Sequence, residues 1–597
     1  MSDATTRNLR SGEFLIEQAT PDQIFVPEHF DQEDAMIGQT VEKFIREQVL
    51  PVKDKLDAQE EGIHKKLLAQ LGELGIFMAD VPEEMDGLGV SKKATMRVAE
   101  KIGLASSFTP ACVVQAGIGG LPIIYFGNDD QRGRYLEGIM TGTMATAYAL
   151  TEPGSGSDAL AAKSTAVWDE GKNAYILNGT KQFITNAAFA DIFIVFAKVD
   201  GEKFTCFICE KEMPGLSTGP EEHKMGLKGS STRALIMENV AVPKENVLGE
   251  IGKGHRIAFN VLNIGRLKLA PALLGGMKNS LEDGVRYATE RHQFKKPLAD
   301  FGLIKQKIAG AAMRTYATES MLYRTADLID EHIAAAKSAG ETDTPKATVA
   351  ALKEFAVECS INKVYSSEAL DWIVDEMVQL HGGYGFIAEY PAEGAYRDAR
   401  INRLWEGTSE VNRMIITGTL LTRSMKGELP LLGHIKTISE ELMMRRGAEE
   451  IPDGLLGAES VVIENAKKIS LFVAGAAAQK FMMTMQDQQE ILAWCADMIM
   501  QTFVMESLYL RTKKLEGERD EAEVKARAAA VTMAVEEGFQ LIEGRARSVL
   551  AATASGEELR SMMSMFKKLT RRESLNQVEA GQKLADFVVA KGAYPFE

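Results

Sequence analysis

The fold is decided by a stretch of alternating apolar and polar residues, which reads AKSTAVW at 162–168, NAYILNG at 173–179 and DIFIVFAKV at 191–199. A period of two is typical of half-buried β-strands. Asn178-Gly179 and Asp200-Gly201 stand between paired runs, and both dipeptides favour tight hairpin turns. The pattern therefore predicts an antiparallel β-domain over residues 145–250.

Helical spacing flanks this β-domain on both sides. Apolar residues recur at three- and four-residue steps, as in Leu67-Leu68-Leu71-Leu74, and that spacing is typical of amphipathic helices. We predict one helical domain over residues 31–144 and a helical bundle over residues 251–423. No proline occurs between residues 459 and 591, which predicts a further block of long helices over residues 459–597.

The two remaining segments contain residues that break helices. Residues 1–30 are polar and interrupted by Pro21 and Pro27, so we expect a loosely held arm. Residues 424–458 carry Pro430 and Pro452 among glycines, so we expect a linker. The predicted fold class is mostly α with a central β-domain.

Composition narrows the class of protein. The chain has 597 residues, of which 45% are hydrophobic and 25% charged, as in ordinary globular proteins. It lacks the run of roughly 18 apolar residues that a membrane-spanning helix needs, and its start lacks the apolar region of a secretory signal. Five scattered cysteines indicate a reducing compartment, and we expect a cytoplasmic location. A net charge of −16 opposes nucleic-acid binding, so no such partner is expected.

A glycine-rich loop lies near the start of the β-domain. Gly154-Ser-Gly-Ser-Asp-Ala159 looks like part of a dinucleotide fingerprint, but no crossover helix follows it and the sheet around it reads antiparallel. The segment TEPGSGSD offers backbone N–H groups, small hydroxyls and flexible glycines, which suit an anion-binding nest. A plain turn and an anion site remain equal interpretations of the loop.

Metal and hydrolase sites are not supported. Cys206 and Cys209 have metal-like spacing, but positions i and i+3 of a strand point to opposite faces, so we predict strand-core cysteines. The eight histidines show no HExxH pattern, and we expect no metal. GxSxG and GxxxxGK[ST] are missing as well, which argues against acyl transfer at a serine and against P-loop phosphate chemistry.

One acidic residue stands out as a candidate base. Glu406 follows Trp405, an apolar neighbour, and precedes Gly407, which lets the backbone approach a ligand. Carboxylate bases are tuned in clefts with apolar walls. A lone glutamate at a helix start is more often a surface residue that complements the helix dipole, so catalysis is the second interpretation from pattern alone.

Six strings taken together resemble the acyl-CoA dehydrogenase family, in the family's order, over residues 31–421. They are Tyr148-Ala-Leu-Thr-Glu-Pro-Gly-Ser-Gly-Ser-Asp158, Asn178-Gly-Thr-Lys-Gln-Phe-Ile-Thr-Asn186, Lys224-Met-Gly-Leu-Lys-Gly-Ser-Ser-Thr232, Arg291-His-Gln-Phe294, Gln379-Leu-His-Gly-Gly-Tyr-Gly385 and Trp405-Glu-Gly-Thr-Ser-Glu410. The helical tail and Phe301-Gly-Leu-Ile304 resemble the very-long-chain branch. The implied fold is a helical bundle, an antiparallel β-barrel or sandwich and a four-helix bundle, followed by a C-terminal helical domain.

The resemblance implies oxidation of a fatty acyl-CoA to the trans-2-enoyl-CoA in β-oxidation, with FAD as cofactor. Glu406 aligns with the base that removes the α-proton. Gly265 occupies the place of the base in other branches and cannot serve, which favours Glu406. Asn263, Arg266 and Gly407 are carried over as substrate-side residues.

The resemblance also assigns flavin contacts. Tyr148, Leu150, Thr151, Gly156 and Ser157 would line the flavin and its phosphates, with Ser157 also on the substrate side, and Thr185 would donate to flavin N5. Phe183 stands where the family usually has tryptophan, so a shielding ring is kept and the indole N–H is lost. Thr408 and Glu410 would contact the adenosine side of the same FAD.

A second group would reach the FAD of a neighbouring subunit. It consists of Arg291, Gln293, Phe294, Gln379, Gly382 and Gly383, with Lys295 where glycine is common. A homodimer is then the minimum assembly, with a tetramer as the alternative. The electron acceptor implied by the family is an electron-transfer flavoprotein. The rivals are an acyl-CoA oxidase that uses O₂ and a non-catalytic FAD-binding assembly protein; the intact Glu406 argues against the second.

Two features leave alternatives open. The glycines Gly117, Gly119 and Gly120, expected in a helix, either leave room for a long acyl tail or allow close helix contact. Of the 28 methionines, 13 follow residue 424. They indicate either loose helical core, which we favour, or a peripheral membrane or protein contact.

Overall fold

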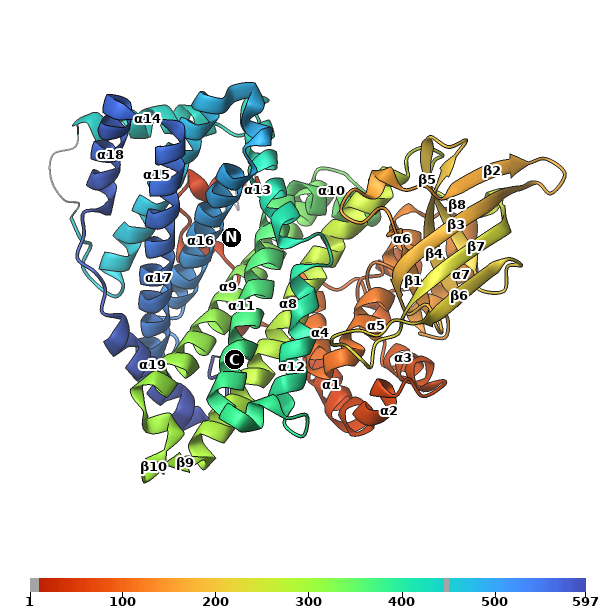
Figure 1. Ribbon diagram of the computed structural model, residues 1–597, viewed down its shortest axis with the longest axis horizontal. Coiled ribbons are helices and arrows are strands. Elements are labelled where there is room, and N and C mark those ends of the chain that lie inside the picture. Colours follow the sequence, from red (N-terminus) through yellow and green to blue (C-terminus); the bar gives the residue numbers. More distant parts are fainter. Residues whose placement is uncertain (1–9, 445–449, 597) are drawn as a thin grey trace.

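The computed structural model describes residues 10–444 and 450–596, and it arranges them as one β-domain and three helical blocks (Figure 1). The β-domain lies at one end of the molecule, the long helices α8, α9 and α11 lie in the middle, and the C-terminal helices lie at the other end. The mostly helical class with a central β-domain is confirmed.

The first block packs short helices beside the β-domain. Its helices are α1 (Gln32–Phe44), α2 (Lys53–Asp57), α3 (Ile63–Glu73), α4 (Lys92–Ile102), α5 (Thr109–Gln115), α6 (Leu121–Phe126) and α7 (Asp129–Met140). Gly117, Gly119 and Gly120 lie in the turn between α5 and α6, so the expected helix is wrong there. A β-carbon at Gly119 would collide with Thr146, and one at Gly120 would press on Ile139. Close packing explains these glycines, and none borders open space.

The sheet has eight strands in the order β6-β7-β3-β2-β4-β5-β8, with β1 beside β4. They are β1 (Thr146–Ala149), β2 (Thr165–Asp169), β3 (Ala174–Thr185), β4 (Ile192–Val199), β5 (Lys203–Glu210), β6 (Leu216–Glu221), β7 (Thr232–Pro243) and β8 (Val247–Leu248). A purely antiparallel sheet is wrong, because β4 pairs in parallel with β1 and with β2. The alternation of apolar and polar residues indicates which face of a strand is buried, but not whether the neighbouring strand is parallel or antiparallel. The sequence could therefore not predict the parallel pairs.

The two expected turns have different outcomes. Asp200 and Gly201 both have positive φ, at 54° and 78°, and they join the antiparallel strands β4 and β5, as expected for a tight hairpin. Asn178-Gly179 lies inside β3, where the register against β7 shifts, so it forms a bulge and not a turn. A β-carbon at Gly179 would collide with Ser164.

The cysteines of β5 confirm the strand-core prediction. Cys206 and Cys209 are both free and fully buried, and they belong to different apolar clusters on the two faces of the sheet. Cys206 packs with Phe196 and Phe204, whereas Cys209 packs with Phe193 and Val195.

The middle block is a bundle of long helices. It contains α8 (Gly254–Glu290), α9 (Gly302–Ser338), α10 (Thr344–Glu354), α11 (Ala356–His381), α12 (Pro391–Ala399) and α13 (Ser409–Met425), and the short strands β9 (His292–Gln293) and β10 (Lys296–Pro297) follow α8. Helix α11 contacts α8, α9 and α13. Met277, Tyr316 and Ile361 are fully buried between these helices and form one continuous core with the C-terminal block.

The C-terminal block contains α14 (Leu431–Met444), α15 (Gly457–Phe481), α16 (Gln489–Lys514), α17 (Glu521–Thr553), α18 (Gly556–Thr570) and α19 (Gln577–Lys591). The linker expected over residues 424–458 contains helix α14, and its residues 445–449 lie outside the described residues. Pro430 directly precedes α14, and proline at a helix start costs no hydrogen bond. Lys468 pairs with Glu441 at 2.8 Å and fastens α14 to α15.

The methionines that follow residue 424 divide between the two interpretations. Met498, Met500 and Met505 are buried in α16, as expected for helical core. The exposed group consists of Met425, Met443, Met444, Met482 and Met483.

Helices α8 and α16 are long and apolar enough to span a membrane by length and composition, but 83% of the apolar window of each helix is buried inside the molecule, as in core helices.

The expected loose arm is wrong for residues 10–30. Phe14 is buried and its ring lies 4.8 Å from that of Phe503 on α16. The side chain of Glu28 is fully buried and pairs with Arg511 at 2.7 Å and with Arg527 at 2.6 Å. The prolines do not loosen the segment, because each begins a short 3₁₀ turn, Pro21–Gln23 and Pro27–His29.

We expect Glu28→Gln to destabilise the protein by about 3 to 5 kcal/mol at pH 7, because it leaves two buried guanidinium groups underpaired. Burial raises the pKa of Glu28, but Arg511 and Arg527 outweigh it and lower the pKa to about 2. Since this folded-state pKa is depressed, the stabilisation is complete above the unfolded pKa and is lost as pH falls toward 2. Calorimetry should show a lower melting temperature at pH 7 and a smaller difference near pH 3. Glu47→Gln, at an exposed glutamate, is the control, and equal effects of the two variants would contradict the assignment.

Candidate active site

The candidate base lies in a strained turn between the bundle helices. Glu406 and Gly407 follow the 3₁₀ segment Arg400–Arg403 and have φ of 54° and 81°, a left-handed conformation that is costly for glutamate. Asn412 on α13 donates from Nδ2 to the carbonyl oxygens of Gly407 and Thr408, at 2.8 and 3.0 Å. These bonds hold the turn, which directs the Glu406 side chain toward α8.

Helix α8 makes room for the carboxylate. A β-carbon added at Gly265 would overlap with Oε2 of Glu406, so only glycine leaves the carboxylate in place. Arg266 donates from Nε to the carbonyl oxygen of Glu406 at 3.2 Å and from Nη1 to Oδ1 of Asn263 at 2.7 Å. The structure therefore brings Asn263, Arg266, Glu406 and Gly407 together, as the sequence predicted.

The surroundings of Glu406 alter its acidity. Its Oε2 atom is buried and has no hydrogen-bond partner among the described residues. Burial raises the pKa of Glu406 to about 7, against the opposing charges of Arg266 and Lys363. A carboxyl group with this pKa is ionised in part at neutral pH and holds a proton well, which are the properties of a general base.

The first strand of the β-domain approaches the same region. Tyr148 on β1 has a buried hydroxyl with no hydrogen-bond partner among residues 10–444 and 450–596. Burial raises the pKa of Tyr148, and the negative charge of Glu406 raises it further, so the tyrosine lies within the electrostatic range of the carboxylate. Two orphaned polar atoms, one from each domain, indicate a place where a ligand completes the hydrogen bonds.

The glycine-rich loop after β1 is held at its ends and open at its centre. Glu152 is buried, and its carboxylate accepts from the backbone N–H of Ser164 at 3.1 Å and from Nζ of Lys181 at 2.7 Å. Nothing lies within 4 Å of a β-carbon placed at Gly154 or Gly156. Ser157 is exposed, while Leu150 is buried and Thr151 is half-buried. Glu152 and Ser155 exchange backbone hydrogen bonds, so the segment forms a turn whose open glycine backbone leaves room for an anion.

A bulge in β3 presents an aromatic ring. The register of β3 against β7 shifts between Lys181 and Ile184, and Phe183 has φ of 60°. Its ring is 62% exposed, which is unusual for phenylalanine and leaves it available to cover a ligand. Thr185 ends the strand and is half-buried. Thr408 is the N-cap of α13, where its Oγ1 accepts from the N–H of Val411 at 3.3 Å, and Glu410 is exposed beside it.

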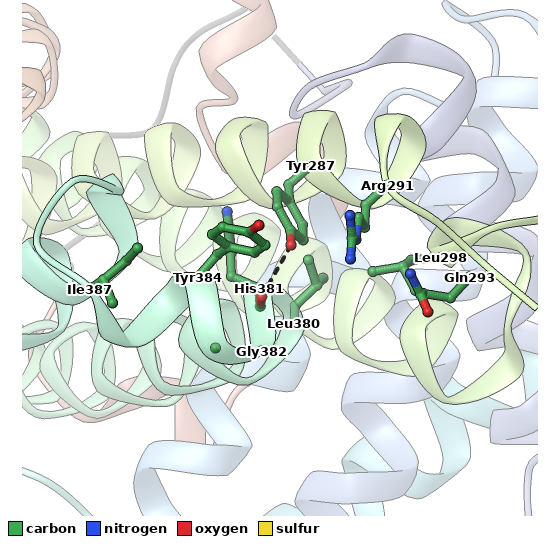
Figure 2. Close-up of a pocket in the computed structure, with 10 residues that line it drawn as sticks. Tyr287, Arg291, Gln293, Leu298, Leu380, His381, Gly382, Tyr384 and Ile387 are labelled. Carbon is green, nitrogen blue, oxygen red and sulfur yellow. Dashed lines mark hydrogen bonds between the residues drawn. The ribbon is translucent and has the colours of Figure 1, made fainter.

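The remaining predicted cofactor residues form a separate cavity of about 420 Å³ at the far end of α8 (Figure 2). The cavity is lined by Arg291, Gln293, Gly382 and Gly383. Phe294 follows Gln293 and is 88% exposed. Gln379 lies in the last turn of α11, just before Gly382. Figure 2 shows Tyr287 and Tyr384 facing into the cavity, and the Tyr287 hydroxyl donates to the His381 carbonyl oxygen at 3.2 Å.

The two groups cannot hold one ligand within one chain. Gly265 and Arg291 are 26 residues apart on and just beyond α8, which at 1.5 Å per residue is about 40 Å. The separation fits the expectation that the second group serves a neighbouring subunit.

Sequence reasoning missed three residues that support the site. Glu152 and Lys181 anchor the open loop as a buried ion pair, and Lys363 on α11 places a buried ammonium near Glu406. Lys363 stands among polar residues in SINKVYSS, so the sequence offered no signal for its burial.

Family models match the chain over most of its length. The acyl-CoA dehydrogenase N-terminal domain matches residues 31–143, the middle domain 147–240, and the C-terminal domain 252–421. A second model, also described as an acyl-CoA dehydrogenase C-terminal domain, matches residues 465–568.

Individual proteins agree with these models. A probable acyl-CoA dehydrogenase of Bacillus subtilis is 48% identical over 576 residues, covering 96% of this chain and 97% of that protein. The human mitochondrial very long-chain specific acyl-CoA dehydrogenase is 36% identical and matches 67% of this chain and 60% of its own length. The crystal structure of an acyl-CoA dehydrogenase complexed with FAD, from Bacillus anthracis, superposes with a TM-score of 0.95 at 47% identity, covering 98% of this chain and all of that one.

We expect Glu406→Gln to stabilise the ligand-free protein increasingly as pH rises from 5 to 7. The folded-state pKa is raised, so ionisation of Glu406 costs stability above its unfolded pKa, by about 3 to 4 kcal/mol once the folded group is ionised. Glutamine avoids this cost. Melting temperatures of both proteins between pH 5 and 8.5 measure the difference, and a gain that does not change with pH would contradict the buried, shifted carboxylate.

Proposed function

The chain belongs to the acyl-CoA dehydrogenase family, and on that premise we propose that it oxidises long-chain fatty acyl-CoA thioesters to trans-2-enoyl-CoA in β-oxidation. The observation that supports this proposal is the Glu406 carboxylate, buried against Gly265 with an oxygen that lacks a partner. The α-proton of a thioester is weakly acidic, so its removal needs a base that is ionised and poorly hydrated.

Glu406 acts on the proton, and its neighbours orient it. Arg266 and Asn412 bind the backbone of the strained turn, so the side chain keeps one direction when a substrate enters. The backbone N–H of Glu406 is assigned, by resemblance, to polarise the thioester oxygen as negative charge develops on it. Asn263 accepts a hydrogen bond from the guanidinium of Arg266 and so fixes its position beside the turn.

The residues of the β-domain fit FAD. The open loop at Gly154 and Gly156 has space for phosphates. The buried Tyr148 hydroxyl has no hydrogen-bond partner among the described residues and could bind the ligand. The exposed Phe183 ring can cover a flat ligand. FAD when bound supplies the oxidant that takes hydride from the β-carbon. Leu150, Thr151, Ser157 and Thr185 would hold it from β1, the loop and β3, and Thr408 and Glu410 from the start of α13.

Assembly and electron transfer are part of the proposal. Arg291, Gln293, Phe294, Gln379, Gly382 and Gly383 would contact the FAD of a second copy, which makes a homodimer the working unit. An electron-transfer flavoprotein is the proposed acceptor. We place the protein in the cytoplasm, with the exposed methionines of residues 425–597 available for a peripheral membrane contact.

The direct test is anaerobic mixing of the FAD-loaded protein with palmitoyl-CoA. We expect the visible absorbance of the oxidised flavin to bleach in the unaltered protein. In Glu406→Gln the flavin should stay bound and oxidised, because no carboxylate accepts the α-proton. Normal bleaching in this variant would remove Glu406 from the mechanism, and rapid peroxide formation in air would favour an oxidase.

Gly265→Ala should reduce the rate of flavin bleaching by roughly 100-fold, because the new methyl group displaces the carboxylate from its position. The fold should survive, since alanine favours the helix by about 1 kcal/mol and the displaced atoms end a flexible side chain. Gly276→Ala on the same helix is the matched control, because its β-carbon would lie 3.8 Å from Leu370 and displace nothing. Equal rates in the two variants would contradict the role of Gly265.

A further inference from the structure

Lys363 is the exception among the buried lysines. Seven lysines in the described part of the chain are buried, and six of them pair with a carboxylate. These six are Lys92, Lys101, Lys181, Lys268, Lys278 and Lys467. Lys363 on α11 has no exposed surface, and its Nζ atom has no hydrogen-bond partner within residues 10–444 and 450–596. An unpaired buried ammonium lowers the stability of the folded protein, so a functional role would explain its presence.

The charged groups that face Lys363 come from three helices and one turn. Burial lowers the pKa of Lys363 to about 8, Glu406 and Glu368 oppose that change, and Arg266 adds to it, with a smaller opposing effect of Glu410. Glu368 is held by Arg413 through two hydrogen bonds of 2.7 and 2.9 Å. Glu410 is exposed to solvent. Glu406 is the carboxylate of this group that has a buried oxygen without a partner.

An orphaned cation and an orphaned anion therefore share one buried region without an ion pair between them. The attraction between charges falls slowly with distance, whereas a hydrogen bond is lost within a few tenths of an ångström. A cation set back from Glu406 favours the ionised carboxylate and does not occupy its oxygens. A direct ion pair would also favour ionisation, but it would hold the carboxylate away from a substrate proton.

We propose that Lys363 is a positioning residue, an offset counter-charge that keeps the Glu406 carboxylate ionised in its buried setting while leaving the carboxylate oxygens free for the substrate. This inference rests on the proposed function. Arg266 contributes charge as well, but its guanidinium is engaged by the Glu406 carbonyl oxygen and by Asn263, whereas Lys363 has no other described partner.

The test is the pH profile of flavin bleaching by palmitoyl-CoA in Lys363→Met, a neutral variant of similar length. Removal of the positive charge favours the protonated carboxyl group, so the acid limb should move to higher pH. We expect a roughly tenfold lower rate at pH 6.5 and a loss of less than about twofold at pH 8.5, equivalent to a displacement of about one pH unit. Lys363→Gln is a second neutral variant if methionine prevents folding, and Lys363→Arg should restore the profile.

Lys467→Met is the matched control, because Lys467 is also buried but pairs with Glu506 in the C-terminal block. It should lower the melting temperature and leave the acid limb in place. A rate loss in Lys363→Met that is equal at all pH values would overturn the proposal and indicate a structural role. A raised KM or a loss of FAD with an unmoved limb would overturn it in favour of a ligand contact.

A second measurement does not depend on turnover. The stability gain from Glu406→Gln should level off near pH 7 in the unaltered background and continue to grow above pH 7 in the Lys363→Met background, because the carboxyl group there stays protonated to higher pH. Identical curves would reject the counter-charge even if the protein failed to oxidise any acyl-CoA. Absence of bleaching with shifted curves would instead reject the proposed function and leave the counter-charge intact.

Discussion

The rest of the site depends on one constraint, which is that the Glu406 carboxylate must be dry, ionised and unoccupied at the same time. Burial alone would neutralise it, and a direct ion pair would occupy it. Three features meet this constraint. A left-handed turn directs the side chain, a glycine on α8 leaves room for the carboxylate, and two nearby cations form no hydrogen bond with its Oε2 atom. Each of these features is unfavourable by itself, as is common where a fold serves chemistry.

At another place in the protein, buried charges form direct ion pairs. Glu28, Arg511 and Arg527 form a closed ionic group that joins residues 10–30 to α16 and α17. Arg511 also reaches Glu319 on α9, at 2.8 Å, so the same group extends into the bundle. Paired charges connect these blocks, whereas Lys363 and Glu406 each have a buried charged atom without a partner among the described residues. This contrast separates scaffold from site more clearly than burial does.

The sequence allowed most of the fold and the site to be predicted, because periodicity and motif order are local properties. The sequence could not predict the parallel pairing of β4 or the bulge at Asn178-Gly179, because both depend on which strands become neighbours. The packing of residues 10–30 was missed because prolines were interpreted as disorder, whereas here they begin short turns. Lys363 was missed for a similar reason: a lysine within a helix looks solvated until the helices on either side of it are known.

Helix α8 connects the two regions of the site in the proposed dimer. The same rod supplies the space beside Glu406 through Gly265 and carries Arg291 to the cavity at its far end. In a dimer the far end of each rod would touch the cofactor of the other copy. One helix would then contribute residues to both active centres of the proposed dimer.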